Sequence, residues 1–170
     1  GVKVRITDKN FNDVPINTEG EILIKGPNVF NGYWNKPAYN KEVFKDEWFI
    51  TGDVGKIDEK GYVYLIGRSK DVIISGGINI YPREIEDVIE SMPKVKECAV
   101  VGIPDEEFGE SVKAYVVLNE GSKLNEDEVI AYCKEKLASF KKPKFVEFLD
   151  ALPKNIMGKM LKENLKNIID

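Results

Sequence analysis

The polar side chains best suited to chemistry in this chain are Asp53, Arg68 and Lys159. Asp53, in the string FITGD, follows a glycine at the expected end of a strand, where a carboxylate can accept two hydrogen bonds from hydroxyl groups. Arg68 stays charged and presents donors in a fixed geometry. Lys159, in LPKNIMGK, lies on a glycine-containing loop beyond the last expected strand. An ammonium group there can stabilise negative charge that develops on reacting atoms.

Each of these residues also has an ordinary structural explanation. An aspartate beside a glycine commonly caps a turn, an arginine pairs with a surface acid, and an isolated Gly-Lys pair usually lies in solvent. The three residues therefore leave both interpretations open until the elements around them are considered.

The chain contains no histidine, which excludes Ser-His and Cys-His nucleophile pairs and histidine metal sites. Cys98 and Cys133 are isolated, without metal-ligand spacing, and we expect both to be small core residues. No metal site is predicted in this chain. Any chemistry must use Lys, Arg, Asp, Glu or the backbone.

The charge is uneven along the chain, although the net charge is only −4. The segment from Lys134 to Lys166 holds nine lysines and four acidic residues. This basic region is either a solvated face or a surface that meets an anion such as a polyphosphate. The acidic total disfavours a general nucleic-acid-binding protein, so no nucleic-acid partner is expected.

With 170 residues, 42% apolar and 32% charged, the chain is long enough for one compact domain and an appendage. No apolar run approaches the roughly 20 residues that span a bilayer. The first residues alternate apolar and polar, as in a half-buried strand rather than a signal peptide. We expect a soluble, cytoplasmic protein without a transmembrane segment.

The first third of the chain reads as short strands with little helix to cover them. We expect strands over 2–7 and 21–25, two strands flanking Thr51-Gly52-Asp53, and a hairpin at Lys60-Gly61. Such strands cannot easily close a core, so this part is predicted to belong to a larger unit.

Residues 67–86, GRSKDVIISGGINIYPREIE, combine three features in twenty positions. Gly67 to Lys70 form a joint between strand-like runs, and Gly76-Gly77 allow positive φ and close approach of a ligand. Pro82 suits the first turn of a helix, with Glu84 and Glu86 near its positive end. A glycine pair between strands is, by itself, most often a simple hairpin.

The remaining residues predict a compact α+β unit. We expect a helix ending at Pro93, strands over 95–101 and 111–118 joined by a loop over 102–109, and a strand over 145–149. A further helix starts at Asn125, with Glu128 completing a capping box. Its apolar face is expected to contain Val129, Tyr132, Cys133, Leu137 and Phe140. A terminal helix is expected from the apolar residues Leu161, Leu165, Ile168 and Ile169.

The string over 67–86 resembles the signature of the superfamily of adenylate-forming enzymes, which includes acyl-CoA synthetases, peptide-synthetase adenylation domains and luciferases. The resemblance covers essentially the whole chain. It implies that residues 1–69 are the β-rich end of a large N-terminal adenylation domain. Residues 70–170 are then a mobile C-terminal lid with a three-stranded sheet, helices and a β-hairpin.

The resemblance also implies roles for individual residues. Asp53 would hold the ribose hydroxyls of ATP or of an acyl-adenylate, and Arg68 would approach the ribose and phosphate side. Lys70 would be the hinge, and Lys159 the catalytic lysine of adenylation. The family usually has Thr or Ser before the glycine preceding that lysine, where this chain has Met157.

For the second step, the resemblance places Gly76 and Gly77 on the tunnel for the pantetheine arm of CoA. Lys141, Lys142 and Lys144 would meet the CoA phosphates, although a solvated helix end explains these lysines equally well. The phosphate loop, the acyl pocket and the magnesium-binding glutamate of the family have no match in this chain, so Mg²⁺ ligands are expected outside it.

The resemblance implies that this chain is part of an acyl-CoA ligase, which uses ATP to activate a carboxylic acid. The motif DVIISGGINIYPREIE is most similar to that of ligases for fatty or other hydrophobic acids. Its partners would be ATP, the acid, CoA and the absent N-terminal domain, and the isolated chain would be inactive. Three alternatives remain open at this point. They are the lid of a peptide-synthetase adenylation domain or acyl-AMP ligase, a non-catalytic binding module, and a small nucleic-acid-binding domain.

Overall fold

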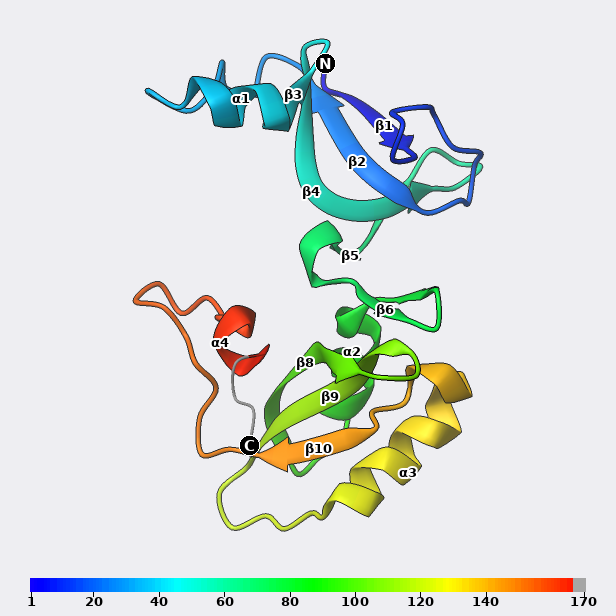
Figure 1. Ribbon diagram of the computed structural model, residues 1–170, viewed down its shortest axis with the longest axis vertical. Coiled ribbons are helices and arrows are strands. Elements are labelled where there is room, and N and C mark those ends of the chain that lie inside the picture. Colours follow the sequence, from blue (N-terminus) through cyan, green and yellow to red (C-terminus); the bar gives the residue numbers. More distant parts are fainter. Residues whose placement is uncertain (167–170) are drawn as a thin grey trace. The chain divides into compact units, whose positions relative to one another are not determined.

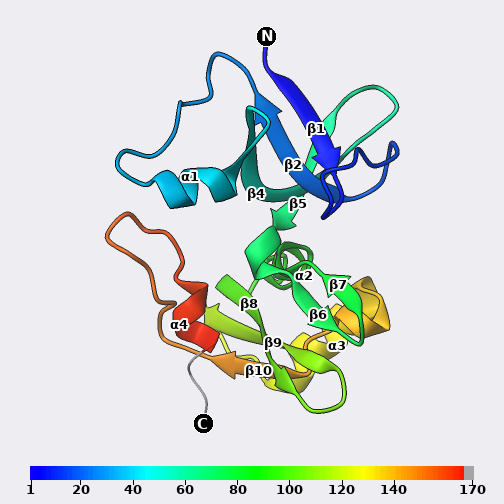
Figure 2. The same ribbon diagram turned by 45° about the horizontal axis from the view of Figure 1, so that its top comes forward.

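The computed structural model describes residues 1–166, which divide into two compact units, Gly1–Lys70 and the described residues from Asp71 onwards (Figures 1 and 2). The boundary falls one residue after the expected end of the first domain at 69. No helix among the described residues is long and apolar enough to cross a membrane.

The first unit is a five-stranded antiparallel sheet in the order β1-β2-β4-β3, with β5 also pairing with β4. Its elements are β1 (Lys3–Thr7), β2 (Gly20–Lys25), α1 (Pro37–Val43), β3 (Phe44–Lys45), β4 (Trp48–Ile57) and β5 (Val63–Arg68). Only four of its apolar side chains are buried: Ile6, Ile22, Leu23 and Val54. This thin core agrees with the expectation of few covering helices.

One prediction for this unit was wrong. Thr51-Gly52-Asp53 does not separate two strands, because β4 runs without a break from Trp48 to Ile57. The pairing with β2 shifts register here, from Leu23 opposite Ile50 to Glu21 opposite Val54. The extra residues form a bulge, with Gly52 at a φ of 73°. Asp53 therefore lies inside a strand and not at its end.

The second unit begins with a tight hairpin, β6 (Ile73–Ser75) and β7 (Ile78–Ile80), after a short 3-10 turn (Ser69–Asp71). Gly76 and Gly77 form its two-residue turn, with φ values of 56° and 79°. Two positive φ angles match the twist of the flanking strands and favour glycine. α2 (Pro82–Glu90) follows, with Pro82 in its first turn as expected.

The sheet of this unit is built around β9 (Gly109–Leu118). It pairs with β8 (Val95–Asp105) on one side, and on the other with β10 (Phe145–Phe148) in parallel and with β6 at Ser75 and Gly109. β8 pairs only with β9 and is an edge strand. The expected three-stranded sheet and hairpin thus form one five-stranded sheet. The mixed α+β class is confirmed.

Side chains alternate between the two faces of β8 and β9 and build two cores. Cys98, Val100, Ala114 and Val116 pack on one face with residues of α2 and α3 (Glu126–Lys136). The other face packs Ala99, Val101, Tyr115 and Val117 against Leu152 and Leu165. Leu165 belongs to α4 (Lys162–Lys166), so the sheet is covered on both faces (Figure 1).

Two sequence-based boundaries of this unit were wrong. Most of the loop expected over 102–109 belongs to a long hairpin, because β8 continues to Asp105 and β9 begins at Gly109. α3 ends at Lys136, so Phe140 lies on a separate 3-10 turn (Ser139–Lys141) and is 49% exposed. α4 is described as far as Lys166, and the expected contributions of Ile168 and Ile169 lie outside the described residues.

Candidate functional site

The bulge in β4 and the end of β5 bring together two of the predicted nucleotide-binding residues. Asp53 and Arg68 are paired in the strand register, and Arg68 Nη1 lies 2.9 Å from Asp53 Oδ1. Their side chains are 28% and 48% exposed, so both can still reach a ligand. Thr51 Oγ1 donates to the Ile22 carbonyl at 2.8 Å and accepts from the Asp53 amide at 3.0 Å, which fixes the backbone beneath the carboxylate.

This pair fits both interpretations considered for Arg68. A partly exposed ion pair contributes little to stability, so it is weak evidence for a purely structural role. The bulge can also direct both side chains towards a ligand. The Asp53 carboxylate could then accept hydrogen bonds from hydroxyl groups, while the Arg68 guanidinium faces an anion.

Lys159 lies in an exposed loop between β10 and α4, and the loop projects away from the sheet of its own unit (Figures 1 and 2). Ile156 and Met157 at the tip are fully or almost fully exposed. No ion pair of Lys159 is present among residues 1–166. The ammonium group is therefore available to a ligand, as the prediction for Lys159 requires.

The loop is shaped by Asn155, which the sequence analysis did not single out. Its Oδ1 accepts from the amides of Met157 at 3.0 Å and Lys159 at 2.9 Å. Its own amide donates to the Lys159 carbonyl at 2.9 Å, and Gly158 takes a φ of 78°. An asparagine that bonds the backbone two residues on is a recognisable turn signal. The NIMG string could have revealed this turn.

The remaining predicted residues lie in or next to the glycine hairpin. Lys70 sits on the 3-10 turn at the end of the first unit, where a change of backbone torsions would act as a hinge. The Gly76 amide donates to the Phe108 carbonyl at 2.8 Å, and an added Cβ would lie 3.3 Å from the Phe108 ring. A Cβ on Gly77 would meet nothing within 4 Å, so space next to this turn is open.

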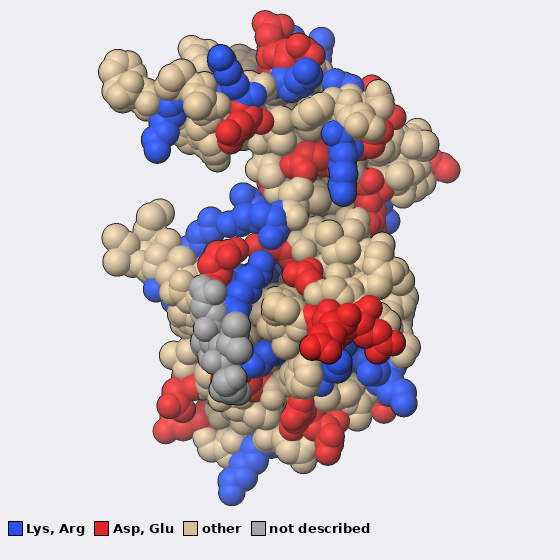
Figure 3. Space-filling model, viewed as in Figure 1, with Lys and Arg blue, Asp and Glu red and all other residues tan. Residues whose placement is uncertain are grey.

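The lysine-rich segment is less basic than its sequence suggests. Five of its nine lysines form ion pairs, mostly with acids from earlier elements: Lys141 with Glu84, Lys144 with Asp105, Lys154 with Glu97, Lys162 with Glu86 and Lys166 with Glu163. On the face shown in Figure 3, blue and red residues are interspersed. The pairing weakens the case for CoA phosphates at Lys141 and Lys144.

Other groups give no sign of a reaction centre. Cys98 and Cys133 are buried, as expected, and burial raises the pKa of Cys133 to about 11. Burial, followed by the charge of Glu86, raises the pKa of Cys98 further. Among the residues that the structure describes, no cluster of three or more His, Cys, Asp or Glu side chains could hold a metal ion.

Comparison with known proteins places this geometry in a family. Residues 84–159 match the AMP-binding enzyme C-terminal domain. The chain is 45% identical over 163 residues to a feruloyl-CoA synthase from Amycolatopsis sp., covering 96% of this chain and 33% of that protein. It is 47% identical over 146 residues to a long-chain-fatty-acid–CoA ligase from Bacillus subtilis, covering 86% of this chain and 26% of that protein.

A solved structure gives the same result. The o-succinylbenzoate CoA synthetase (MenE) from Bacillus subtilis, in complex with the acyl-adenylate intermediate OSB-AMP, matches with a TM-score of 0.93 and 38% identity, covering 99% of this chain and 34% of that one. The chain thus spans about a third or less of the length of these relatives. It belongs to the superfamily of adenylate-forming enzymes, and residues 84–159 are its AMP-binding enzyme C-terminal domain.

Proposed function

We propose that this chain is the C-terminal part of an AMP-forming acyl-CoA ligase. In the first step, a carboxylate oxygen attacks the α-phosphorus of ATP, and pyrophosphate leaves to give an acyl-adenylate. In the second step, the CoA sulfur attacks the acyl carbon, AMP leaves, and a thioester forms. The first unit acts as the end of the large adenylation domain, and the second as a lid that moves about Lys70.

The exposed Lys159 ammonium on its hydrogen-bonded loop is the observation that carries this proposal. In the adenylation step, charge accumulates on the phosphate and carboxylate oxygens, and a lysine placed there stabilises the transition state more than the ground state. Asp53 accepts from the ribose hydroxyls, and Arg68 lies on the phosphate side. Asn155 orders the loop that presents the lysine, by accepting from the amides of Met157 and Lys159.

The acid is proposed to be fatty or otherwise hydrophobic. Two relatives of this chain are named for ferulate and for long-chain fatty acids, which are largely apolar acids. Gly76 and Gly77 are proposed to line the path of the CoA arm, in keeping with the open space beside Gly77. Mg²⁺ ligands and the acyl pocket are proposed to lie outside this chain. A cytoplasmic location stays a prediction.

The test uses the full-length enzyme that contains this chain. Lys159→Ala should lower acid-dependent pyrophosphate exchange by roughly 100-fold or more, because it removes a charged group that acts in the transition state. Thioester formation from supplied acyl-adenylate should change little. Lys134→Ala, which removes an exposed lysine on α3, is the matched control and should leave both steps unchanged.

Equal losses in both half-reactions would contradict the role of Lys159. Adenylation without any CoA consumption would point instead to a carrier-protein acceptor. For the isolated 170-residue chain we expect no measurable acyl-CoA formation, since it lacks the phosphate loop and the acyl pocket.

A further inference from the structure

Glu86 is a buried carboxylate that the proposed reaction does not use. The residue is 6% exposed, and it is the only buried acidic residue in the described part of the chain. Its Oε1 accepts from the Val100 amide at 2.9 Å and from Lys162 Nζ at 2.6 Å. The Glu86 and Lys162 side chains are 8% and 18% exposed, so the pair is largely removed from water.

The position of this carboxylate links three elements. Val100 lies on β8, whose outer edge has no neighbouring strand, and Glu86 on α2 accepts one of its amide protons. Lys162 begins α4, which packs on the opposite face of the sheet from α2 through Leu165. One oxygen atom therefore joins α2, the edge of the sheet and the first residue of α4.

Stability alone is a poor explanation for this arrangement. Burying an ion pair has a large desolvation cost, and an apolar pair of similar volume often gives equal or higher stability. What the charged pair provides, and an apolar contact does not, is a fixed direction and distance between its partners.

The segment next to Lys162 is the loop that carries Lys159, three residues earlier. Its tip, Ile156 and Met157, is exposed, while Met160 at its C-terminal end packs against the apolar cluster that contains Leu165. The two arms of the loop are joined by the bond from the Leu161 amide to the Pro153 carbonyl, 2.9 Å, and by the bridge between Lys154 and Met160. The loop is held to the rest of the domain by the Lys154–Glu97 ion pair on its N-terminal arm, by the packing of Met160, and by the Lys162–Glu86 ion pair next to its C-terminal arm.

A second contact supports the same end of the loop. Tyr115 Oη donates to the Leu165 carbonyl at 2.9 Å, and Leu165 is fully buried. This contact secures the far end of α4, while Lys162 secures the near end. The Lys162 and Glu86 side chains are 18% and 8% exposed, against 38% and 23% for Lys154 and Glu97, so the Lys162 contact is the less solvated of the two ion pairs and its loss should leave the C-terminal arm of the loop less firmly held.

We propose that Glu86 and Lys162 are positioning residues for the adenylation step, because they set where the loop presents Lys159. This inference rests on the proposed function. Neither residue touches the reacting atoms in this scheme. Both act through the backbone of residues 159–162.

The structural half of this proposal can be tested in the 170-residue chain by amide hydrogen exchange. The reporters are the hydrogen-bonded amides of Asn155, Lys159 and Leu161. Lys162→Met should speed their exchange by roughly tenfold or more, because their opening no longer requires breaking a buried ion pair. Lys162→Arg should restore slow exchange. Unchanged exchange in Lys162→Met would overturn the proposal.

Lys166→Met is the matched control. It makes the same substitution in the last turn of the same helix, where Lys166 lies 3.8 Å from the mostly exposed Glu163. The three reporter amides should exchange as in the unmodified chain. Equal acceleration by Lys162→Met and Lys166→Met would show that any loss in α4 loosens the loop, and would overturn the specific role of Lys162.

The functional half is tested in the full-length enzyme. Lys162→Met and Glu86→Gln should each lower kcat for pyrophosphate exchange roughly 10- to 100-fold, as expected for a displaced catalytic group, with KM for ATP nearly unchanged. Thioester formation from supplied acyl-adenylate should stay within about threefold, and Lys162→Arg should recover most of the adenylation rate.

A loss shared equally by both half-reactions would mean that the pair only holds the domain together, and would overturn the positioning role. If the unmodified enzyme forms no acyl-adenylate from any acid, the proposed function fails. The exchange measurement does not depend on activity, so it still decides whether Lys162 holds the loop.

Discussion

Asp53 forms an ion pair with Arg68 and is also proposed to bind the ribose, and these two interactions are expected to differ in free energy. Its ion pair with Arg68 is partly exposed, and such pairs are worth roughly 0.2–1 kcal/mol of stability. Hydrogen bonds from ribose hydroxyls to the same carboxylate would each be worth about 1.5–3 kcal/mol in nucleotide binding. The structural role of Asp53 can therefore be distinguished from its binding role by measuring stability and ATP affinity separately.

For Asp53→Asn we expect a small structural and a large functional effect. The free energy of unfolding of the full-length enzyme should fall by less than about 1 kcal/mol in urea titrations. In the full-length enzyme, the apparent affinity for ATP should fall by roughly tenfold or more, because a neutral amide is a weaker acceptor than a carboxylate. A large loss of stability with unchanged ATP affinity would assign Asp53 to the scaffold.

Asp105 is the residue for which the structure indicates a clear pH dependence. Lys144 Nζ lies 2.8 Å from its carboxylate, Ser111 Oγ also donates to it, and the amide of Phe108 donates at 3.1 Å. The hydrogen bond from Lys144, followed by that from Ser111, holds the pKa of Asp105 well below its ordinary value of 3.8. The ionised form is thus favoured in the folded state.

Because the pKa is lower in the folded state, Asp105 adds stability above pH 3.8, and this contribution is lost as the pH falls further. Asp105→Asn should therefore be less stable than the unmodified chain at pH 7, with a difference that shrinks progressively below pH 4 in urea titrations. Asp150→Asn, at an exposed position, is the control and should show no such trend. A difference that grows towards low pH would refute this assignment.

At the scale of elements, the glycine hairpin is held by the turn between β8 and β9. Glu110 Oε2 accepts from the Ile74 amide at 2.7 Å, and the Phe108 carbonyl accepts from Gly76. Gly102 leaves room for the same carboxylate, since a Cβ there would lie 2.9 Å from Glu110 Oε1. The position of Gly76 and Gly77 thus depends on a residue more than thirty positions away.

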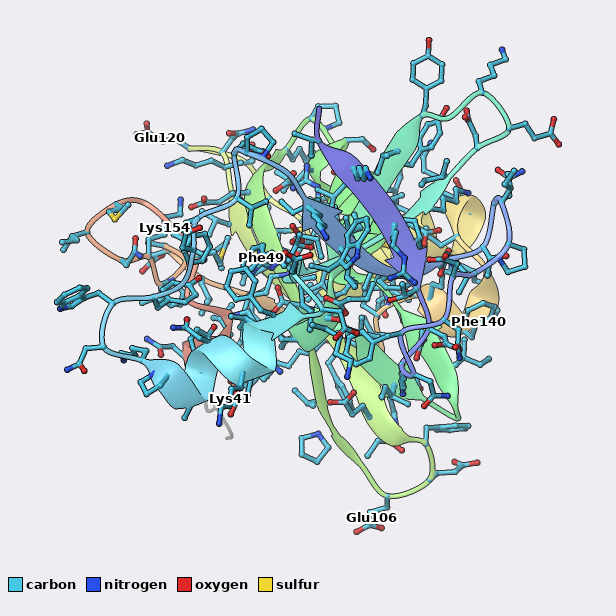
Figure 4. The ribbon with its side chains drawn as sticks, turned by 90° about the horizontal axis from the view of Figure 1, so that it is seen from above. Lys41, Phe49, Glu106, Glu120, Phe140 and Lys154 are labelled. Atoms are coloured by element: carbon cyan, nitrogen blue, oxygen red, sulfur yellow. The ribbon has the colours of Figure 1, made fainter. Side chains whose placement is uncertain are left out.

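Glu110→Ala should loosen this hairpin while the β8–β9 pairing persists. We expect the Ile74 amide to exchange faster by about tenfold and the free energy of unfolding to fall by roughly 1.5–3 kcal/mol, as for the loss of one charged hydrogen bond. Glu106→Ala is the matched control, because Glu106 lies at the tip of the same turn and points away from the sheet (Figure 4). If the Ile74 amide exchanged at a similar rate in both variants, the Glu110 carboxylate would not be what holds the hairpin.

The sequence predicted elements well where the signal is local. Pro82 begins α2, and the Asn125–Glu128 capping box begins α3 with both of its hydrogen bonds formed. Prediction failed where the partner is distant in sequence. The glycine at position 52 suggested a strand break, and only the pairing with β2 shows that it lies in a bulge inside β4, where it takes a positive φ.

The same reason explains what was missed in the site. Lys159 could be singled out from its loop and the family resemblance, whereas the contact between Glu86 and Lys162 joins residues 76 positions apart. Charge counting along the chain predicted a basic surface because it could not see the acids from α2 and β8 that pair with those lysines. Patterns within one element are readable from sequence, and pairings between elements are not.

At the scale of the whole molecule, the two units differ in how well they are stabilised. The second unit has two apolar clusters, one on each face of its sheet. The first buries only four apolar side chains and leaves those of β5 and the preceding turn exposed, with Tyr62 at 65%, Tyr64 at 48% and Leu65 at 69%. Its exposed apolar surface is what a unit normally covered by further protein would show.

We therefore expect residues 71–170 to fold alone and residues 1–70 not to. A chain of about 100 residues with two cores can offset its conformational entropy, whereas 70 residues around a thin core cannot. The 71–170 chain should show dispersed NMR signals and a cooperative thermal transition within a few degrees of that of the same residues in the 170-residue chain. The 1–70 chain should lack a cooperative transition. A folded 1–70 chain would contradict its need for further protein, and a molten 71–170 chain would contradict the independence of the lysine-bearing unit.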